Sequence, residues 1–444
     1  MKTTKKREVG KLGIVHLNCC GIDIGSKFHM VAIGLADQDV YKFGVYTKDH
    51  EELIEFLQAK NVIHIAMEST GSYWQTLFSA LQSAGFKVIL VDGKQTKSLR
   101  KKTDIKDARA IYQLHTLGLL TGCFLPDQVT EKIRVYYRHR NNLIQESSRL
   151  TNRMQQAMRL MNIRLDNVLS DITGQSGRRI IESIISGQTD PITLSKLADK
   201  RVRKTSIEIQ NSLQGHWKEE QIFVLKDCYE AFLQLQDRIL QIDNEIKQIL
   251  EEVPRHPVPP QGITKKSVRK NQINIGLEQL SYSYYGVDLF AIPSVSYNLV
   301  MTLISEIGLG ISRFSTSKEF SSYLRLAPNN RVSGGRRISG RTPKGKSSLA
   351  IAFRNAANTI TKQRSANPLL SFFQRKAVQK GRSAAITATA RKLASIVWHM
   401  ITHNQQYTPV QYETYSKQIK RKAISNIKRK MKRLGIAPQE FATI

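Results

Sequence analysis

Short apolar runs alternate with longer amphipathic stretches between residues 20 and 121. Runs of apolar and β-branched residues bounded by turn residues predict strands, whereas apolar residues three or four positions apart predict helices. The expected strands are 20–23, 28–34, 40–46, 62–67 and 87–91, and the expected helices are 50–59, 73–84 and 105–120. Three strands therefore precede the first helix, and strands and helices alternate after it.

This order of elements is that of the ribonuclease H superfamily, whereas a doubly wound Rossmann unit would alternate from its first strand. Four carboxylates fall at corresponding points of that order. Asp23 ends the first strand, Glu68 ends the fourth, and Asp104 and Asp107 lie one turn apart on the last helix. Acids gathered where strands end chelate hard cations, and two-metal phosphoryl transfer needs several of them. The sequence therefore predicts a Mg²⁺ site.

These acids also have structural interpretations. Asp104 suits a helix N-terminus, where its charge complements the helix dipole, and Asp107 has Lys106 and Arg109 as neighbours for an ion pair. The Gly-Ile-Asp-Ile-Gly segment at 21–25 also resembles the phosphate loop of actin-like ATPases and sugar kinases. Sugar kinases need two such α/β units, and only one is visible, which argues against that class.

The middle of the chain is expected to be helical. Residues 131–165 predict a long helix rich in arginine. Farther on, two interleaved sets of apolar residues recur every seven positions: Leu225, Phe232, Ile239, Ile246 and Val253, with Cys228, Leu235, Ile242 and Ile249. This seam over about four heptads predicts a coiled coil, either within one chain or between chains. The Pro-rich basic segment 256–288 is expected to be a linker or an insertion.

A second compact region is expected from residue 289 to residue 405, with helices at 299–307, 314–326, 346–363 and 383–403. A glycine- and arginine-rich loop interrupts these helices. The candidate nucleic-acid contacts are the cations of this loop, with two lysines beside Asp104: Arg331, Arg336, Arg337, Arg341, Lys344, Lys346, Lys101 and Lys102. Beyond residue 406 we expect a basic tail, either helical or disordered.

Ser333 stands in this loop before two glycines. Glycines let a backbone approach phosphates closely, and guanidinium groups neutralise and orient them. A hydroxyl held there is a candidate nucleophile for a DNA phosphodiester. Most loops of this composition only contact phosphate, however, and no general base is evident nearby. The residues alone therefore favour phosphate binding over nucleophilic attack.

The charge balance indicates a polyanionic partner. The chain has 68 Lys and Arg against 36 Asp and Glu, a formal net charge of +32, which attracts DNA or RNA. No apolar stretch approaches the roughly 18 residues of a membrane-spanning helix, and the N-terminus lacks the pattern of a signal peptide. The four cysteines show no zinc-like spacing. We therefore expect a cytoplasmic protein that binds nucleic acid and no membrane.

Several short motifs together resemble a known family. They are Gly21-Ile-Asp23, Ala66-Met-Glu68-Ser-Thr-Gly71 and Lys102-Thr-Asp104-Ile-Lys-Asp107-Ala, followed by Ser176-Gly177, Gly187-Gln-Thr-Asp190-Pro191, the heptad segment, Ser333-Gly334 and Ala390-Arg391-Lys392. The combination covers nearly the whole chain. It resembles the DEDD insertion-sequence transposases of the IS110 family, which are bridge-RNA-guided recombinases.

The resemblance implies a RuvC-like N-terminal domain in which Asp23, Glu68, Asp104 and Asp107 bind Mg²⁺. It also implies a C-terminal transposase domain in which Ser333 forms a covalent phosphoserine link with DNA. The implied partners are donor and target DNA, a structured guide RNA encoded by the element, and further copies of the chain. Those copies would form a homotetramer, a dimer of dimers, with sites composed across protomers. Such a protein would act at the nucleoid of a bacterium or archaeon.

One segment departs from the family pattern. Family members carry an Ile-Pro-Gly-Ile-Gly hairpin at the start of the second domain, whereas this chain has Ile292-Pro293-Ser294-Val295-Ser296. Glycines in such a hairpin bring backbone amides to phosphate. Their replacement by Ser294 and Ser296 therefore weakens the expectation of a DNA contact at this point.

The expected organisation has five parts: an α/β RuvC/ribonuclease H-like domain at 1–130, a basic helix and coiled-coil region at 131–255, the linker at 256–288, a mainly α-helical transposase domain at 289–405, and the tail at 406–444. The expected function is that of a DNA transposase or recombinase that mobilises its own insertion sequence. One alternative is a metal-dependent junction resolvase or nuclease in which the acids cleave and Ser333 only binds phosphate. Another is a scaffold that binds DNA or RNA without cleaving it.

Overall fold

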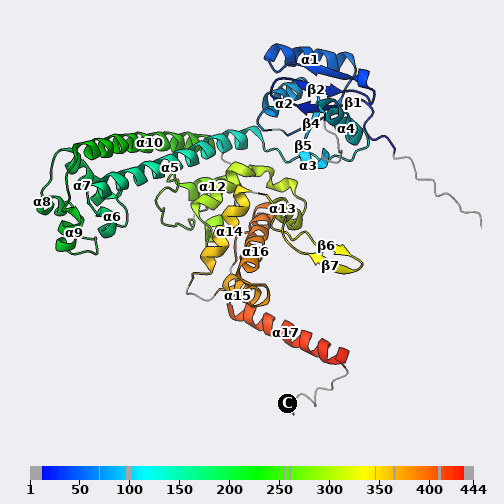
Figure 1. The fold of residues 1–444 in the computed structure, drawn as a ribbon. Helices are drawn as coiled ribbons and strands as arrows, with labels where there is room; N and C mark the ends of the chain where they lie inside the picture. The colour runs from blue at the N-terminus through cyan, green and yellow to red at the C-terminus, as the bar shows by residue number, and fades with distance from the viewer. Residues whose placement is uncertain are drawn as a thin grey trace, which may run out of the picture. The chain divides into compact units, whose positions relative to one another are not determined.

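The computed structural model describes residues 13–69, 71–96, 103–253, 256–259, 262–345, 347–363, 367–408 and 412–434. The chain divides into two compact units, Met1–Leu125 and Pro126–Ile444 (Figure 1). The first unit combines a sheet with helices, and the described part of the second is almost entirely helical. This confirms the expected order of an α/β region followed by a mainly helical remainder.

The first unit is built on a five-stranded sheet in the order β3-β2-β1-β4-β5. β1, β2 and β3 are antiparallel neighbours, and β4 and β5 run parallel to β1. The elements are β1 (Cys19–Ile24), β2 (His29–Ala32), η1 (Asp37–Asp39), β3 (Val40–Phe43), α1 (Thr47–Ala59), β4 (His64–Glu68), α2 (Trp74–Ser83), β5 (Lys87–Val91), α3 (Gly93–Thr96) and α4 (Asp104–Thr116).

Every strand and long helix expected in this region is present and in the expected order. The main difference in bounds is at the end of α4, which was expected to reach residue 120 and stops at Thr116. Gly118 has a φ of +66°, a left-handed conformation that commonly terminates a helix. The short α3 was not expected, because a single helical turn has no periodicity to detect.

Gly21 allows α4 to lie directly on the central strand. A Cβ at this position would stand 2.2 Å from the backbone nitrogen of Tyr112 and 2.7 Å from the backbone oxygen of Ala108, so no larger residue fits. Side chains two positions apart point to the same face of a strand, and therefore Asp23 faces the side of the sheet that α4 covers. The first turn of α4 is thereby placed beside the end of β1.

Two histidines of the first unit are buried in the folded chain. His29 is 1% exposed and His115 is 3% exposed, and three of their four ring nitrogens have no hydrogen-bond partner within the described residues. Burial is the main cause that lowers the pKa of each to about 4, and neighbouring histidines lower it further. Both side chains are therefore neutral at pH 7.

Acidification from pH 7 to about 4.5 is expected to destabilise the first unit. The unfolded chain takes up these two protons near pH 6.5, whereas the folded chain resists them until about pH 4, so stability is lost across this window. A difference of this size corresponds to about 3 kcal/mol per histidine. Thermal unfolding at the two pH values measures the loss. His29→Leu should shrink the difference between them, and an unchanged difference would contradict the assignment.

The second unit contains the remaining elements: α5 (Gln128–Leu160), α6 (Leu165–Val168), α7 (Gln175–Ile185), α8 (Pro191–Ser195), α9 (Ser206–Leu213), α10 (Glu219–Glu251), α11 (Leu277–Tyr285), η2 (Leu289–Ala291), α12 (Tyr297–Glu306), η3 (Gly308–Arg313), α13 (Ser317–Tyr323), β6 (Arg331–Ser333), β7 (Arg336–Ser339), α14 (Ser348–Ile360), α15 (Pro368–Lys380), α16 (Arg382–His403) and α17 (Tyr412–Leu434). No helix in the described ranges is both long and apolar enough to cross a membrane.

Two helices of 33 residues each, α5 and α10, lie side by side along their length (Figure 1). They are antiparallel: Arg140 bonds to Asp243, and Ser147 accepts a hydrogen bond from Gln236. The heptad positions expected from the sequence bury their side chains here, from Leu225 to Ile249, with Ile242 half-buried. The apolar seam of α10 is therefore covered within the same chain.

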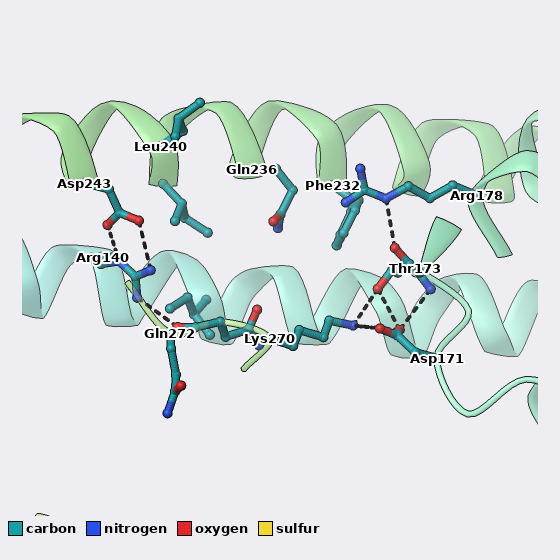
Figure 2. A pocket seen from close by; sticks show the side chains of 14 residues that line it. Arg140, Asp171, Thr173, Arg178, Phe232, Gln236, Leu240, Asp243, Lys270 and Gln272 are labelled. Atoms are coloured by element: carbon teal, nitrogen blue, oxygen red, sulfur yellow. Dashed lines mark hydrogen bonds and ion pairs between the residues drawn. The ribbon is translucent and has the colours of Figure 1, made fainter. Parts of the chain in front are cut away.

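A buried ion pair joins the two helices (Figure 2). Arg140 and Asp243 are 2% and 8% exposed, and Arg140 Nη2 donates to Asp243 Oδ2 at 3.1 Å. Arg140 Nη1 also donates to the backbone oxygen of Asn271 at 3.0 Å. The next residue back, Lys270, bonds to Asp171 Oδ1 at 2.6 Å. The segment around 270 is thus tied to α5 at Asn271 and to the loop before α7 at Lys270, and these residues line a hollow of about 440 Å³.

Removing one partner of this pair should cost more stability than removing both. Burial raises the pKa of Asp243 even though Arg140 bonds to it. The Asp243 carboxylate is therefore stable as a buried charge only because the Arg140 guanidinium is paired with it. Asp243→Ala leaves a buried guanidinium without its carboxylate and should destabilise the protein by about 3–5 kcal/mol. The double variant Arg140→Met with Asp243→Leu should recover most of that loss. Urea unfolding of the three proteins provides the measurement, and an equal loss in both variants would contradict the prediction.

Another arginine of α5, Arg134, caps the C-terminal end of α12. Arg134 donates to the backbone oxygens of Ser305 and Glu306 at 3.1 and 3.0 Å, where a helix C-terminus has unpaired carbonyl groups. Arg138 bonds to the Glu306 side chain at 2.9 Å. Arg134 and Arg138, which belong to the arginine-rich helix expected from the sequence, therefore help to hold α12 against α5.

The C-terminal helices differ from the expected set in one addition. α15 was not expected, although Asn367 caps its first turn and Pro368 occupies its first position, a combination typical of a helix start. α12, α13, α14 and α16 lie within or close to their expected ranges. The described part of the basic tail contains α17, so the helical of the two expected forms is present there.

Candidate active site

The sheet of the first unit places two of the four acids next to each other. β1 and β4 are parallel and paired up to Ile22 and Met67, and Asp23 and Glu68 follow these residues by one position. The carboxyl ends of neighbouring parallel strands meet at one edge of a sheet, which is where α/β folds place functional groups. Both side chains are half-buried at this edge.

Glu68 is held by residues of the short helix α3. The hydroxyl of Thr96, which is 7% exposed, donates to Glu68 Oε2 at 2.8 Å. A Cβ on Gly93 would stand 2.4 Å from Glu68 Oε1, so glycine is needed for the carboxylate to occupy this place. Thr96 and Gly93 carry no sequence signal for this role, because only the turn after β5 brings them to the carboxylate.

The helix α4 brings the other two acids to the same place. The cap of this helix is Thr103, whose hydroxyl accepts from the backbone nitrogen of Lys106, so Asp104 is not needed for that role. Arg109, an expected partner for Asp107, is paired with Asp37 at 2.7 Å instead. The contacts of the described residues therefore bear out neither a capping bond from Asp104 nor a pair between Asp107 and Arg109, although both acids lie in the first turn of α4, where their charge suits the helix dipole.

The four acids interact electrostatically. The pKa of Asp23 is raised to about 6, first by burial and then by the charges of Glu68, Asp107 and Asp104. Asp23 and Asp104 also line a hollow of about 220 Å³ together with residues 24–28. A carboxylate in this position is destabilised by its neighbours and would be stabilised by a cation.

The donor set suits a hard divalent cation. Mg²⁺ prefers carboxylate oxygens and retains several waters, so it needs few direct protein ligands. In the described residues, no three His, Cys, Asp or Glu side chains stand close enough to ligate one ion. The residue types and the raised pKa of Asp23 are those expected where a divalent cation binds, although the described side chains do not converge on one ion position.

Ser333 lies in the second unit, on a hairpin rather than in the open loop expected from the sequence. β6 and β7 pair antiparallel, with Ser333 opposite Arg336, and Gly334 and Gly335 form the two-residue turn with φ of +54° and +73°. Two-residue hairpin turns of this kind need positive φ at both positions, which explains the glycine pair. The hairpin therefore displays Ser333 next to its tip, where the side chain is exposed.

Arg331 and Arg336 lie on the same hairpin as Ser333, and Arg341 and Lys344 follow the end of β7. Arg331, Arg336, Arg341 and Lys344 are all exposed. The side chain of Arg337 and residues Lys346, Lys101 and Lys102 lie outside the described residues. No hydrogen-bond or ion-pair partner of the Ser333 side chain occurs in the part of the chain that the structure describes, so no general base is evident there.

Two family models match the chain. A model for the DEDD transposases of IS110 elements, described as Transposase, matches residues 20–163. A second, described as Transposase IS116/IS110/IS902 family, matches residues 288–374. Together they span about half of the chain and include all five candidate catalytic residues. The chain belongs to the IS110 family of transposases. Among curated proteins, no match was found.

Membership of the IS110 family makes DNA the substrate and DNA cutting and recombination the general reaction. It also bears on the segment 292–296, which departs from the family pattern described above. Ser294 replaces a family glycine yet adopts a φ of +68°, and its hydroxyl accepts a hydrogen bond from Gln363 at 3.1 Å. The backbone thus takes a conformation suited to glycine, and the side chain is used within the fold.

Proposed function

We propose that this IS110-family transposase mobilises its own insertion sequence with a RuvC-like Mg²⁺ site and a serine nucleophile, guided by a structured RNA. The observation that carries the proposal is the placement of Asp23 and Glu68 at the ends of the neighbouring parallel strands β1 and β4, with Asp104 and Asp107 in the first turn of α4, close enough for all three charges to add to the effect of burial on the pKa of Asp23. The sheet order, with three antiparallel strands followed by two parallel ones, supports the assignment to the RuvC and ribonuclease H type.

Asp23, Glu68, Asp104 and Asp107 would hold the metal. When bound, Mg²⁺ supplies positive charge where the attacked phosphodiester gains negative charge. Thr96 orients Glu68 by its hydrogen bond. The half-buried position of Asp23 and Glu68 limits access of bulk water and so strengthens their interaction with a cation.

Ser333 would attack a DNA phosphate. Its Oγ forms a new bond to phosphorus while the bond from phosphorus to one sugar oxygen breaks. The serine proton passes to solvent and the departing oxygen takes up a proton, so the product is a phosphoserine link and a free hydroxyl end. Arg331 and Arg336 flank Ser333 on the hairpin and can neutralise the phosphate during this step.

The assembly we propose is a homotetramer, a dimer of dimers, with the acids of one protomer and Ser333 of another at a shared site. The antiparallel pair of α5 and α10 is interpreted as a coiled coil within one chain. The excess of basic residues, +32 overall, supports guide RNA and two DNA segments as partners. We place the protein at the nucleoid of a bacterial or archaeal cytoplasm.

The proposal is tested by incubating the protein with Mg²⁺, its candidate RNA and labelled target DNA, followed by denaturing electrophoresis. A protein–DNA adduct that survives denaturant is expected. Cleaved DNA without any adduct would instead favour a metal-dependent junction resolvase. That alternative is favoured by one observation, the lack of a base beside Ser333 in the described part of the chain.

A further inference from the structure

A groove runs beside the hairpin that carries Ser333. Its volume is about 990 Å³, and it is lined by the foot of the hairpin and by α15 and α16. Figure 1 shows the hairpin of β6 and β7 standing out from the helices of this unit. The hairpin foot is anchored by the backbone of Asn329, which donates to the Arg341 oxygen at 2.9 Å.

The charged side chains that line this groove in the described part of the chain are all positive. Four cations line it, namely Arg341, Lys376, Lys380 and Arg391, and none of the described residues that line it is acidic. In a concave site, charges of one sign reinforce one another and concentrate the opposite ion. The groove therefore fits a ligand with several negative charges in a row.

Arg391 is the cation of this groove whose surroundings indicate an anionic ligand. It is half-buried on α16, and its guanidinium has no hydrogen bond or ion pair with another described side chain. Elsewhere in this unit, the buried Arg140 is paired with Asp243 and the largely buried Arg134 with Glu131. A guanidinium loses hydration on burial and needs an anion to offset the loss. An anionic ligand would supply it here.

The wall of the groove formed by α16 permits close approach. It consists of small side chains that recur at one helical turn along α16, namely Ser383, Ala384, Thr387 and Ala388. The next turn of the helix carries Arg391. Such a wall leaves room for a sugar-phosphate chain beside the helix. Small residues alone would not define a site, but here they adjoin the unpaired half-buried cation.

The groove begins close to the candidate nucleophile. Arg331 pairs with Ser339 and Ser333 pairs with Arg336, with a bulge between the two pairs, so Ser339 in the groove wall lies two to three residues, or about 7–10 Å, along the hairpin from Ser333. Neighbouring phosphates of one strand lie at a comparable spacing. A strand whose phosphate reaches Ser333 would thus place its next phosphates in the groove.

We propose that this groove binds the backbone of the DNA strand that Ser333 attacks, and that Arg391 and Lys380 contact the phosphates flanking the attacked one. This inference rests on the proposed function, because it takes Ser333 as the nucleophile. It assigns α15 and α16 a role in positioning the strand, through phosphates and therefore independently of its sequence.

The test is equilibrium binding of a short single-stranded DNA to full-length protein carrying Ser333→Ala, which removes the chemistry. Arg391→Ala and Lys380→Ala should each weaken binding about tenfold for oligonucleotides of any sequence. Each should also reduce the slope of log K against log salt by about 0.7. Arg391→Lys should lose less. Lys380 is exposed at the end of α15, so its variant remains informative if Arg391→Ala folds poorly.

The matched control is Lys392→Ala, an exposed lysine next to Arg391 that does not line the groove. An equal loss in this control would overturn the proposal, because the attraction would then belong to the basic surface as a whole. Unchanged DNA binding with weakened binding of an RNA of the same sequence would also overturn it. If unaltered protein forms no adduct while Arg391→Ala loses DNA affinity, the Ser333 chemistry fails, and the groove is a DNA-backbone site without the link to an attacked strand.

Discussion

Ser333→Ala is expected to abolish the denaturant-resistant protein–DNA adduct. The alanine side chain has no oxygen to bond to phosphorus, and removal of a nucleophile lowers turnover by about 10⁶-fold where this has been measured. Folding should be unaffected, because Ser333 is exposed and the turn is formed by Gly334 and Gly335. Labelled DNA on a denaturing gel gives the readout.

The control for this experiment is Ser322→Ala, which changes an exposed serine of α13 in the same unit. It should form the adduct at the normal rate. An adduct that persists in Ser333→Ala would move the covalent link to another residue. Binding of target DNA by Ser333→Ala should remain close to normal, since the cations of the hairpin are retained. Loss of binding together with loss of the adduct would point to a role in binding instead.

Glu68→Gln and Asp104→Asn should each lower DNA cleavage by several orders of magnitude. Each change removes one negative charge from the group that raises the pKa of Asp23, and therefore one ligand and part of the attraction for Mg²⁺. Chelation of divalent metal should have the same effect on the unaltered protein. Adding Mg²⁺ back should restore the unaltered protein and leave the variants inactive.

Asp92→Asn provides the matched control for the acids. Asp92 follows β5 at the same end of the sheet, but its side chain is 48% exposed and bonds to the Lys94 backbone at 3.2 Å. Its replacement should leave cleavage intact. Cleavage that survives both Glu68→Gln and Asp104→Asn would refute the metal site. Titration of Mg²⁺ against the rate of adduct formation would detect a weakened site at higher metal concentration.

The elements of the first unit were predictable because their signals are local. Each strand there is a compact apolar run, and α4 has a clear helical period. The sequence also placed Asp23 and Glu68 at the ends of their strands. The helix α15 was missed although it is as amphipathic as α4 and its start is marked by Asn367 and Pro368, so the local signals for it were present in the sequence.

The candidate site was only partly predictable. Asp104 and Asp107 could be placed on one helix from the sequence, but their approach to Asp23 depends on α4 packing against Gly21. The role of Thr96 depends in the same way on a turn that brings it back to Glu68. Contacts between residues far apart in the chain follow from packing, which no local pattern encodes.

The sequence by itself determined the element order of the first unit, the apolar seam of α10 and the candidate acids and serine. These follow from periodicity, residue chemistry and charge, which are properties of neighbouring residues. Tertiary structure alone decided that the seam is covered by α5 and that Ser333 sits on a hairpin. It also decided that Arg391 lies beside a groove with no carboxylate partner among the described side chains. Each of these depends on which distant surfaces exclude water together, and therefore on the folded chain as a whole.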